Sequence, residues 1–164
     1  MAMDGRRRMA DRIWATNHLS EYGIELEGHI PGYATPGHGL RYLLAAEGGC
    51  VTPKEARFLF RKPSPATERM VTAEIRKGNV IAYTDREGVS HVPVWQFDPR
   101  GGVFAGIPSV LETLRCKTLG SYQLRLFTFF LHPAPMLQLR TPLEALRGGD
   151  GDKVLDAARE ELRF

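Results

Sequence analysis

The sequence has neither a long apolar run nor the cysteine content of a disulfide-stapled protein. Its longest apolar run, residues 126–131, is far shorter than the roughly 20 residues that a membrane-spanning helix needs. The two cysteines, Cys50 and Cys116, are too few for a disulfide framework, so we expect reduced, packed thiols. The basic start of the chain, with Arg6–Arg8, is followed by no apolar segment and does not resemble a signal peptide. These absences predict a cytoplasmic protein without membrane contact.

The signatures of common catalytic and metal sites are also missing. The sequence contains no Gly-x-x-x-x-Gly-Lys-Ser/Thr phosphate loop and no Gly-x-Ser-x-Gly nucleophile elbow. Its five histidines show no His-Glu-x-x-His pattern, and there is no Cys-x-x-Cys pair. Asp150 and Asp152 stand beside a predicted helix start, where capping explains them. We therefore predict no catalytic residue, no cofactor and no metal, and a protein that is not an enzyme.

Charge is unevenly distributed along the chain. The net charge is +3, from 22 basic and 19 acidic residues. Residues 41–80 carry eight basic and four acidic side chains, an excess larger than the whole net charge. Residues 121–164 carry six of each and are neutral. The middle of the chain is therefore suited to phosphate groups, whereas the C-terminal third is not.

The helix, strand and turn signals along the sequence predict three regions: an extension over 1–49, a helix-turn-helix-like segment over 50–98 and a helical region over 99–164. The extension combines a weak amphipathic helix over 9–18 with a Gly/Pro-rich stretch, 28–39, which we interpret as a loop.

The second region begins with a clear helix start, Thr52-Pro53-Lys54-Glu55. Thr caps the helix, Pro takes the first helical position, and Glu55 can reach back to the cap N–H. This helix should end near Phe60. Ser64-Pro65 gives the same signal and predicts a second helix to about Lys77, with Gly78 as a left-handed cap. Two short helices joined by a tight turn predict a helix-turn-helix.

The second helix has two faces. Arg69, Thr72 and Arg76 share one stripe, and Val71 and Ile75 lie opposite. This division suits a helix packed on one side and offered to a DNA groove on the other, the alternative being an ordinary solvated basic face.

A β-hairpin should follow, with arms at 80–84 and 89–92 joined by Asp85–Gly88. A hairpin directly after a helix-turn-helix is the layout of a winged helix, with Arg86 at the tip as a phosphate contact. The predicted DNA-binding residues are Arg61, Lys62, Arg69, Thr72, Arg76 and Arg86.

The remaining chain predicts a small helical core. The expected helices run from Ile107 through Leu114, from Ser121 to Leu131, from Thr141 to Gly148-Gly149, and onward from a cap at Asp150 or Asp152. The fold class is thus mainly α: a helix-turn-helix with a short β-hairpin wing, followed by a small C-terminal helical domain.

Two segments resemble those of the Xre/MbcA/ParS-type antitoxins. Val92-Pro93-Val94-Trp95-Gln96-Phe97-Asp98 is similar to their Pro-x-Trp/Phe-Gln-Phe segment, and Arg140–Asp150 with Val154–Ala158 resembles their C-terminal toxin-binding motif. The helix-turn-helix candidate resembles the one that often precedes it, so the resemblance covers about residues 50–162. Where the family usually has Gly-Gly or Leu-Gly before the arginine, this chain has Leu137-Gln138-Leu139.

The resemblance implies a type II antitoxin that neutralises a cognate toxin, commonly of the RES class, and binds its own promoter. The implied partners are the protein toxin and operator DNA, in a homodimer or a toxin–antitoxin hetero-oligomer. A neutral, apolar C-terminal third fits a protein interface. The implied toxin-binding residues are Arg140, Thr141, Leu143, Leu146, Arg147, Asp150, Leu155 and Phe164, with a core role as the alternative for each leucine.

Two other functions remain open at this point. One is a stand-alone, excisionase-like DNA-binding regulator whose C-terminal helices only dimerise. The other is an antitoxin whose helix-turn-helix survives as a scaffold without binding DNA.

Overall fold

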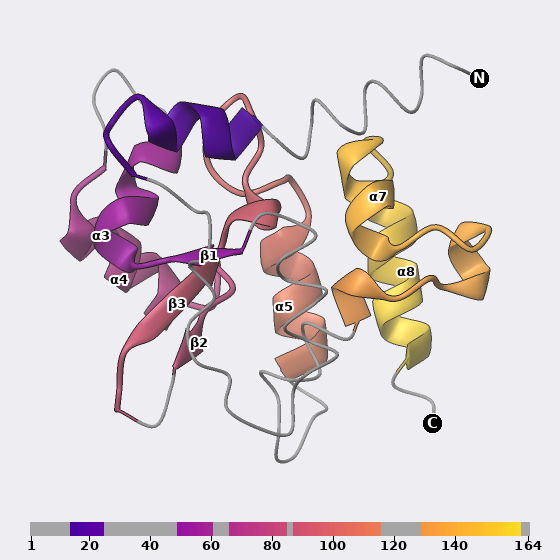
Figure 1. Ribbon diagram of the computed structural model, residues 1–164. Helices are drawn as coiled ribbons and strands as arrows, with labels where there is room; N and C mark the ends of the chain where they lie inside the picture. Colours follow the sequence, from indigo (N-terminus) through magenta and orange to yellow (C-terminus); the bar gives the residue numbers. More distant parts are fainter. Residues whose placement is uncertain (1–13, 25–48, 61–65, 85–86, 116–128, 162–164) are drawn as a thin grey trace.

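The computed structural model describes residues 14–24, 49–60, 66–84, 87–115 and 129–161 (Figure 1). Over these residues the chain is mainly helical with one small antiparallel sheet, which confirms the expected mainly-α class. In Figure 1 the sheet and two helices lie on one side, two C-terminal helices lie on the other, and α5 stands between them. None of the described helices combines the length and the apolar character that a bilayer crossing requires. The main helices are α3 (Pro53–Ala56), α4 (Glu68–Arg76), α5 (Ile107–Arg115), α7 (Pro142–Arg147) and α8 (Gly151–Glu161).

Helix α3 begins where the capping pattern predicts. The Thr52 hydroxyl accepts a hydrogen bond from the Glu55 backbone N–H at 3.2 Å, and the Glu55 carboxylate accepts one from the Thr52 N–H at 3.0 Å. The helix continues as a 3-10 turn, η1 (Arg57–Leu59), and ends at Phe60 as expected. Two otherwise unsatisfied donors of the first turn are therefore paired reciprocally.

Helix α4 begins three residues later than the Ser64-Pro65 pattern predicts. Ser64 and Pro65 lie outside the described residues, and the cap is Thr67, whose hydroxyl accepts a hydrogen bond from the Met70 N–H at 3.2 Å. Glu68 then stands in the first turn, where the helix dipole favours an acidic side chain. The other end agrees with the prediction, because Gly78 follows the last turn with a φ of 78°.

Three short strands form the sheet, in the order β1-β3-β2. Strand β2 (Tyr83–Thr84) pairs antiparallel with β3 (Ser90–Pro93), which confirms a hairpin shorter than predicted. Strand β1 (Cys50–Val51) was not predicted, since two residues carry no alternation pattern; it pairs with the other edge of β3. Cys50 is a buried thiol, as expected, and Cys116 lies outside the described residues.

Residues 14–20 are helical and pack against α3 and α4. Leu19 is fully buried in the same apolar cluster as Leu59 and Val71. The His18 ring nitrogen Nε2 donates to the Phe58 carbonyl at 2.8 Å, and the Tyr22 ring stacks on the Phe58 ring with 4.0 Å between centroids. The predicted helix over 9–18 therefore extends to Ser20, its beginning lying outside the described residues.

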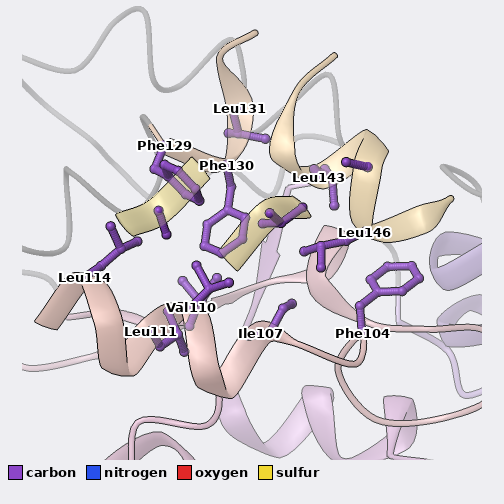
Figure 2. Packing of buried hydrophobic residues seen from close by; sticks show 14 of the residues in the cluster. Phe104, Ile107, Val110, Leu111, Leu114, Phe129, Phe130, Leu131, Leu143 and Leu146 are labelled. Carbon is purple, nitrogen blue, oxygen red and sulfur yellow. The ribbon is translucent and has the colours of Figure 1, made fainter. Parts of the chain in front are cut away.

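The C-terminal half has its own core, built around α5 (Figure 2). Ile107, Val110 and Leu111 project from one face of α5 toward Phe130, which is fully buried. Helices α7 and α8 close the core from the other side and contact each other. Of the predicted apolar helix over 121–131, residues 129–131 are helical, and the rest lies outside the described residues.

The segment Val92–Asp98 connects the two cores. It forms the end of β3 and a buried 3-10 turn, η2 (Val94–Gln96). The Trp95 ring lies 5.4 Å from the Phe130 ring in the C-terminal core, whereas Val94 and Phe97 belong to the N-terminal core. Trp95 packs in the C-terminal core and its neighbours Val94 and Phe97 pack in the N-terminal core, so this short segment belongs to both.

Gln96, in the same segment, is a fully buried polar residue. Its side-chain oxygen accepts from the Ile81 N–H at 2.7 Å, while its amide nitrogen donates to the Ile81 carbonyl at 2.8 Å and the Pro93 carbonyl at 3.0 Å. Backbone groups of the hairpin that would be left without partners are thus satisfied by one side chain.

Candidate functional site

The first candidate surface is the outward face of α4. Arg69, Thr72 and Arg76, which were predicted to lie on one stripe, line a single shallow groove of about 640 Å³ together with Thr67, Glu68 and Ala73. Both arginines are exposed, whereas Val71 on the opposite face is fully buried. The helix is therefore packed on one side and open on the other, as its sequence predicts.

The charges on this helix are arranged so that its arginines stay available. Glu74 pairs with Lys77 at 3.5 Å and accepts a hydrogen bond from the Asn79 side chain at 2.9 Å, away from the groove. Within the described part of the chain, Arg69 and Arg76 make no ion pair with a carboxylate. The groove lining thus carries two arginines against Glu68, a net positive charge of one.

The other predicted DNA-binding residues, Arg61, Lys62 and Arg86, lie outside the described residues. The hairpin that would carry Arg86 at its tip is present, with Val89 exposed next to β3. The structure therefore brings together three of the six predicted residues and leaves the other three unplaced.

The second candidate surface belongs to the C-terminal motif, Arg140–Asp150, which forms one closed unit. The Thr141 hydroxyl caps α7 by accepting from the Glu144 N–H at 3.1 Å. The Arg140 guanidinium donates to the Asp150 carboxylate at 3.0 Å and through Nε to the Leu137 carbonyl at 3.1 Å. These contacts tie the start of α7 to the residue just before α8, so Arg140, Thr141 and Asp150 act within the chain as positioning residues.

Of the two roles that the sequence left open for Leu143 and Leu146, partner contact or core, the structure shows the core role. Leu143 is 1% exposed and Leu146 is 4% exposed, and both point into the C-terminal core (Figure 2). The face of α7 that carries them is needed to cover α5 and α8, which explains their burial. Leu155 is half-buried at the edge of that core, and Phe164 lies outside the described residues.

A cleft of about 440 Å³ opens where α7 meets α8. Leu146, Arg147 and Leu155 contribute one wall, and the other wall comes from the turn at 98–106 and the first turn of α5. Apolar surface from Phe104 is combined with charged groups of both signs. The full lining is Asp98, Arg100, Phe104, Ala105, Gly106, Ser109, Leu146, Arg147, Gly148, Gly149, Gly151, Asp152 and Leu155.

The second wall of this cleft was missed by sequence reasoning. Asp98 closes its turn by accepting from the Arg100 N–H at 2.9 Å, and its own N–H donates to the Gly102 carbonyl at 2.8 Å. The turn then meets α8 at close range, since a Cβ on Gly151 would lie 3.3 Å from the Ala105 carbonyl oxygen. Asp98-Pro99 and Gly101-Gly102 signal a turn, but nothing local signals which helix the turn meets.

Within the described ranges, no group of three or more His, Cys, Asp or Glu side chains is arranged to hold a metal ion. One of the two surfaces is a cationic helix face suited to phosphate, and the other is a cleft of mixed polarity suited to a side chain of another molecule.

Comparison of the chain with protein-family models, with curated proteins and with solved structures found no match. The function is therefore proposed from the residues and geometry of the chain itself.

Proposed function

We propose that the chain is a type II antitoxin whose C-terminal half binds and neutralises a protein toxin of the RES class. The observation that carries the proposal is the cleft, because Arg147 and the half-buried Leu155 of the antitoxin-like motif line it together with the core residue Leu146. Its volume lies within the roughly 300–1,000 Å³ of ligand pockets, enough for one or more partner side chains. Interfaces concentrate their binding energy in such pockets, with charged groups at the rim.

The experiment is growth rescue by the full chain. We expect the product of the open reading frame adjacent to this one to arrest growth when expressed alone, and co-expression of this chain to restore it. Deletion of residues 141–164 is not a clean test, because α7 and α8 complete the core and their loss would unfold the C-terminal half. A substitution that fills the cleft and leaves the core intact is better suited.

Ser109→Trp is such a substitution, since Ser109 is exposed on α5 and lines the cleft. The indole should occupy the space that the partner needs and abolish rescue. Glu112→Trp is the matched control: it places the same indole on the exposed side of the same helix, outside the cleft, and should leave rescue intact. If the Ser109→Trp variant still restores growth, the toxin does not bind at this cleft.

The second part of the proposal is that the chain binds operator DNA through a winged helix-turn-helix. Its support is the order of elements: α3 and α4 in contact, then a hairpin whose strand β3 also pairs with β1. Arg69 and Arg76 are seven residues apart, about two turns or ~10 Å along the helix axis, and lie on one face of α4. A helix that lies in the major groove would therefore offer both guanidinium groups to the same duplex.

DNA binding is tested by a gel shift on the promoter fragment upstream of this gene across a salt series. Replacing Arg69 and Arg76 with Ala should weaken binding and flatten the slope of log K against log salt by about 1.8, or ~0.9 per lost phosphate contact. The control is Lys153→Ala on α8, an exposed cation far along the chain from α4. Unchanged binding by the double variant would favour the scaffold role for the helix-turn-helix.

A further inference from the structure

Helix α4 ends beside a charged side chain from the C-terminal half. Gly78 follows the last turn of α4 with a φ of 78°, and a Cβ placed on it would lie 2.6 Å from one guanidinium nitrogen of Arg115 and 3.2 Å from the guanidinium carbon. Arg115 is the last residue of α5, whose apolar residues belong to the C-terminal core. The missing side chain of Gly78 therefore leaves the space that the guanidinium group occupies.

The guanidinium group of Arg115 has no acidic partner in the described ranges. The side chain is exposed and makes neither an ion pair nor a hydrogen bond there. Glu112, one turn earlier on α5, does not pair with it, and Glu74, in the last turn of α4, pairs with Lys77. No described carboxylate therefore neutralises the positive charge that Arg115 brings to the end of α4.

The position of this charge matters for an anionic partner. Carbonyl groups at the C-terminal end of a helix carry partial negative charge, which repels phosphate. At the end of α4, the Gly78 N–H donates to the Ile75 carbonyl at 3.1 Å and the Asn79 N–H donates to the Glu74 carbonyl at 3.0 Å. The Arg115 guanidinium adds a full positive charge beside these groups, so this end of the helix becomes able to accept phosphate.

Arg115 also extends a series of cations that begins in the groove of α4. Arg69 and Arg76 line that groove, and Gly78 follows Arg76 by two residues. At 1.5 Å of rise per residue, the two groove arginines are ~10 Å apart along the helix axis and Gly78 lies ~3 Å further on. A single phosphate group is too small to contact cations spread over such a length. The repeating phosphates of a nucleic-acid backbone match it better.

We propose that Arg115 is a further phosphate contact in operator binding, supplied to α4 by the C-terminal half of the chain. This inference rests on the DNA-binding part of the proposed function and adds a residue to it. The sequence pattern predicted DNA-binding residues only up to Arg86, because nothing local indicates that the end of α5 meets the end of α4.

The test measures how binding of the full chain to the promoter fragment upstream of this gene depends on salt, by fluorescence anisotropy. Loss of one phosphate contact should flatten the slope of log K against log salt by ~0.9 and weaken binding about eightfold at 0.1 M salt. We expect both changes for Arg115→Ala and for Arg115→Gln, which retains the length of the side chain. Lys153→Ala is the control, since it removes an exposed cation of α8, and it should change neither quantity.

A purely structural role of Arg115 predicts a different result. If the guanidinium group only stabilises the end of α4, its loss lowers the melting temperature and the affinity while the salt slope stays unchanged, which overturns the phosphate contact. Unchanged affinity also overturns it and leaves operator binding through Arg69 and Arg76 standing. An equal loss of slope in Lys153→Ala overturns it as an effect of net charge. If the wild type, folded by circular dichroism, does not bind the fragment, operator binding fails and the Arg115 contact fails with it.

Discussion

Replacement of Gln96 by Leu removes the hydrogen bonds that this side chain makes to Ile81 and Pro93, while the volume of the side chain changes little. Three hydrogen bonds of 2.7–3.0 Å are lost, and the Ile81 N–H and two carbonyl groups remain in a buried environment. At about 1 kcal/mol per net hydrogen bond the loss is about 3 kcal/mol, and unsatisfied buried groups raise it toward ~5 kcal/mol. For a chain of this size, about 3 kcal/mol lowers the melting temperature by roughly 6–12 °C.

The assay is urea unfolding followed by circular dichroism, with thermal melting as a second measurement. Thr113→Val serves as the control, since it removes one surface hydrogen bond of 2.9 Å to the Ser109 carbonyl without burying an unsatisfied group. The control should change the free energy of unfolding by no more than about 0.5 kcal/mol. A loss below about 1 kcal/mol for Gln96→Leu would refute the role given to Gln96.

Other substitutions separate core, cap and surface roles. Leu143→Ala should cost about 2–5 kcal/mol because the side chain is 1% exposed, whereas Leu139→Ala should change stability by no more than about 0.5 kcal/mol, both measured by urea unfolding; equal costs would contradict the placement of these leucines. Thr141→Ala should lose about 1 kcal/mol by removing the α7 cap, and Thr141→Ser should recover most of it; no difference between the two would mean that the hydroxyl does not stabilise the helix.

The elements that could be predicted from the sequence are those whose signals are local. Thr52 and Thr141 each precede Pro and a Glu, and both cap a helix at the predicted residue. Ile107–Arg115 has the helical periodicity of a packed face, and its apolar residues are buried as that pattern requires. Such features depend on residues within one or two turns of each other, so the sequence pattern is sufficient.

The features that were missed depend on contacts between distant residues. β1 is a strand only because Cys50 and Val51 meet β3 some 40 residues later along the chain. The start of α4 was misplaced because Ser64 and Thr67 offer the same capping chemistry. For Leu143 the sequence left a partner contact and a core role both open, because the motif gives only the residue type, and the packing of α7 on its neighbours decides for the core.

The same difference between local signals and contacts of distant residues applies to the candidate sites. The stripe of Arg69, Thr72 and Arg76 is a property of one helix and was predicted. The cleft combines α8 with a turn roughly 50 residues earlier, and no local pattern joins them. The left-handed pair Gln138-Leu139 was also missed, since neither residue type signals positive φ.

The most direct test of partner binding through the C-terminal half is hydrogen–deuterium exchange on the full chain, alone and with the product of the adjacent open reading frame. Binding at the cleft predicts slower exchange over 98–109 and 146–155, with α4 and the hairpin unchanged. Slower exchange confined to α4 and the hairpin, with the C-terminal half unchanged, would contradict the proposed toxin-binding surface.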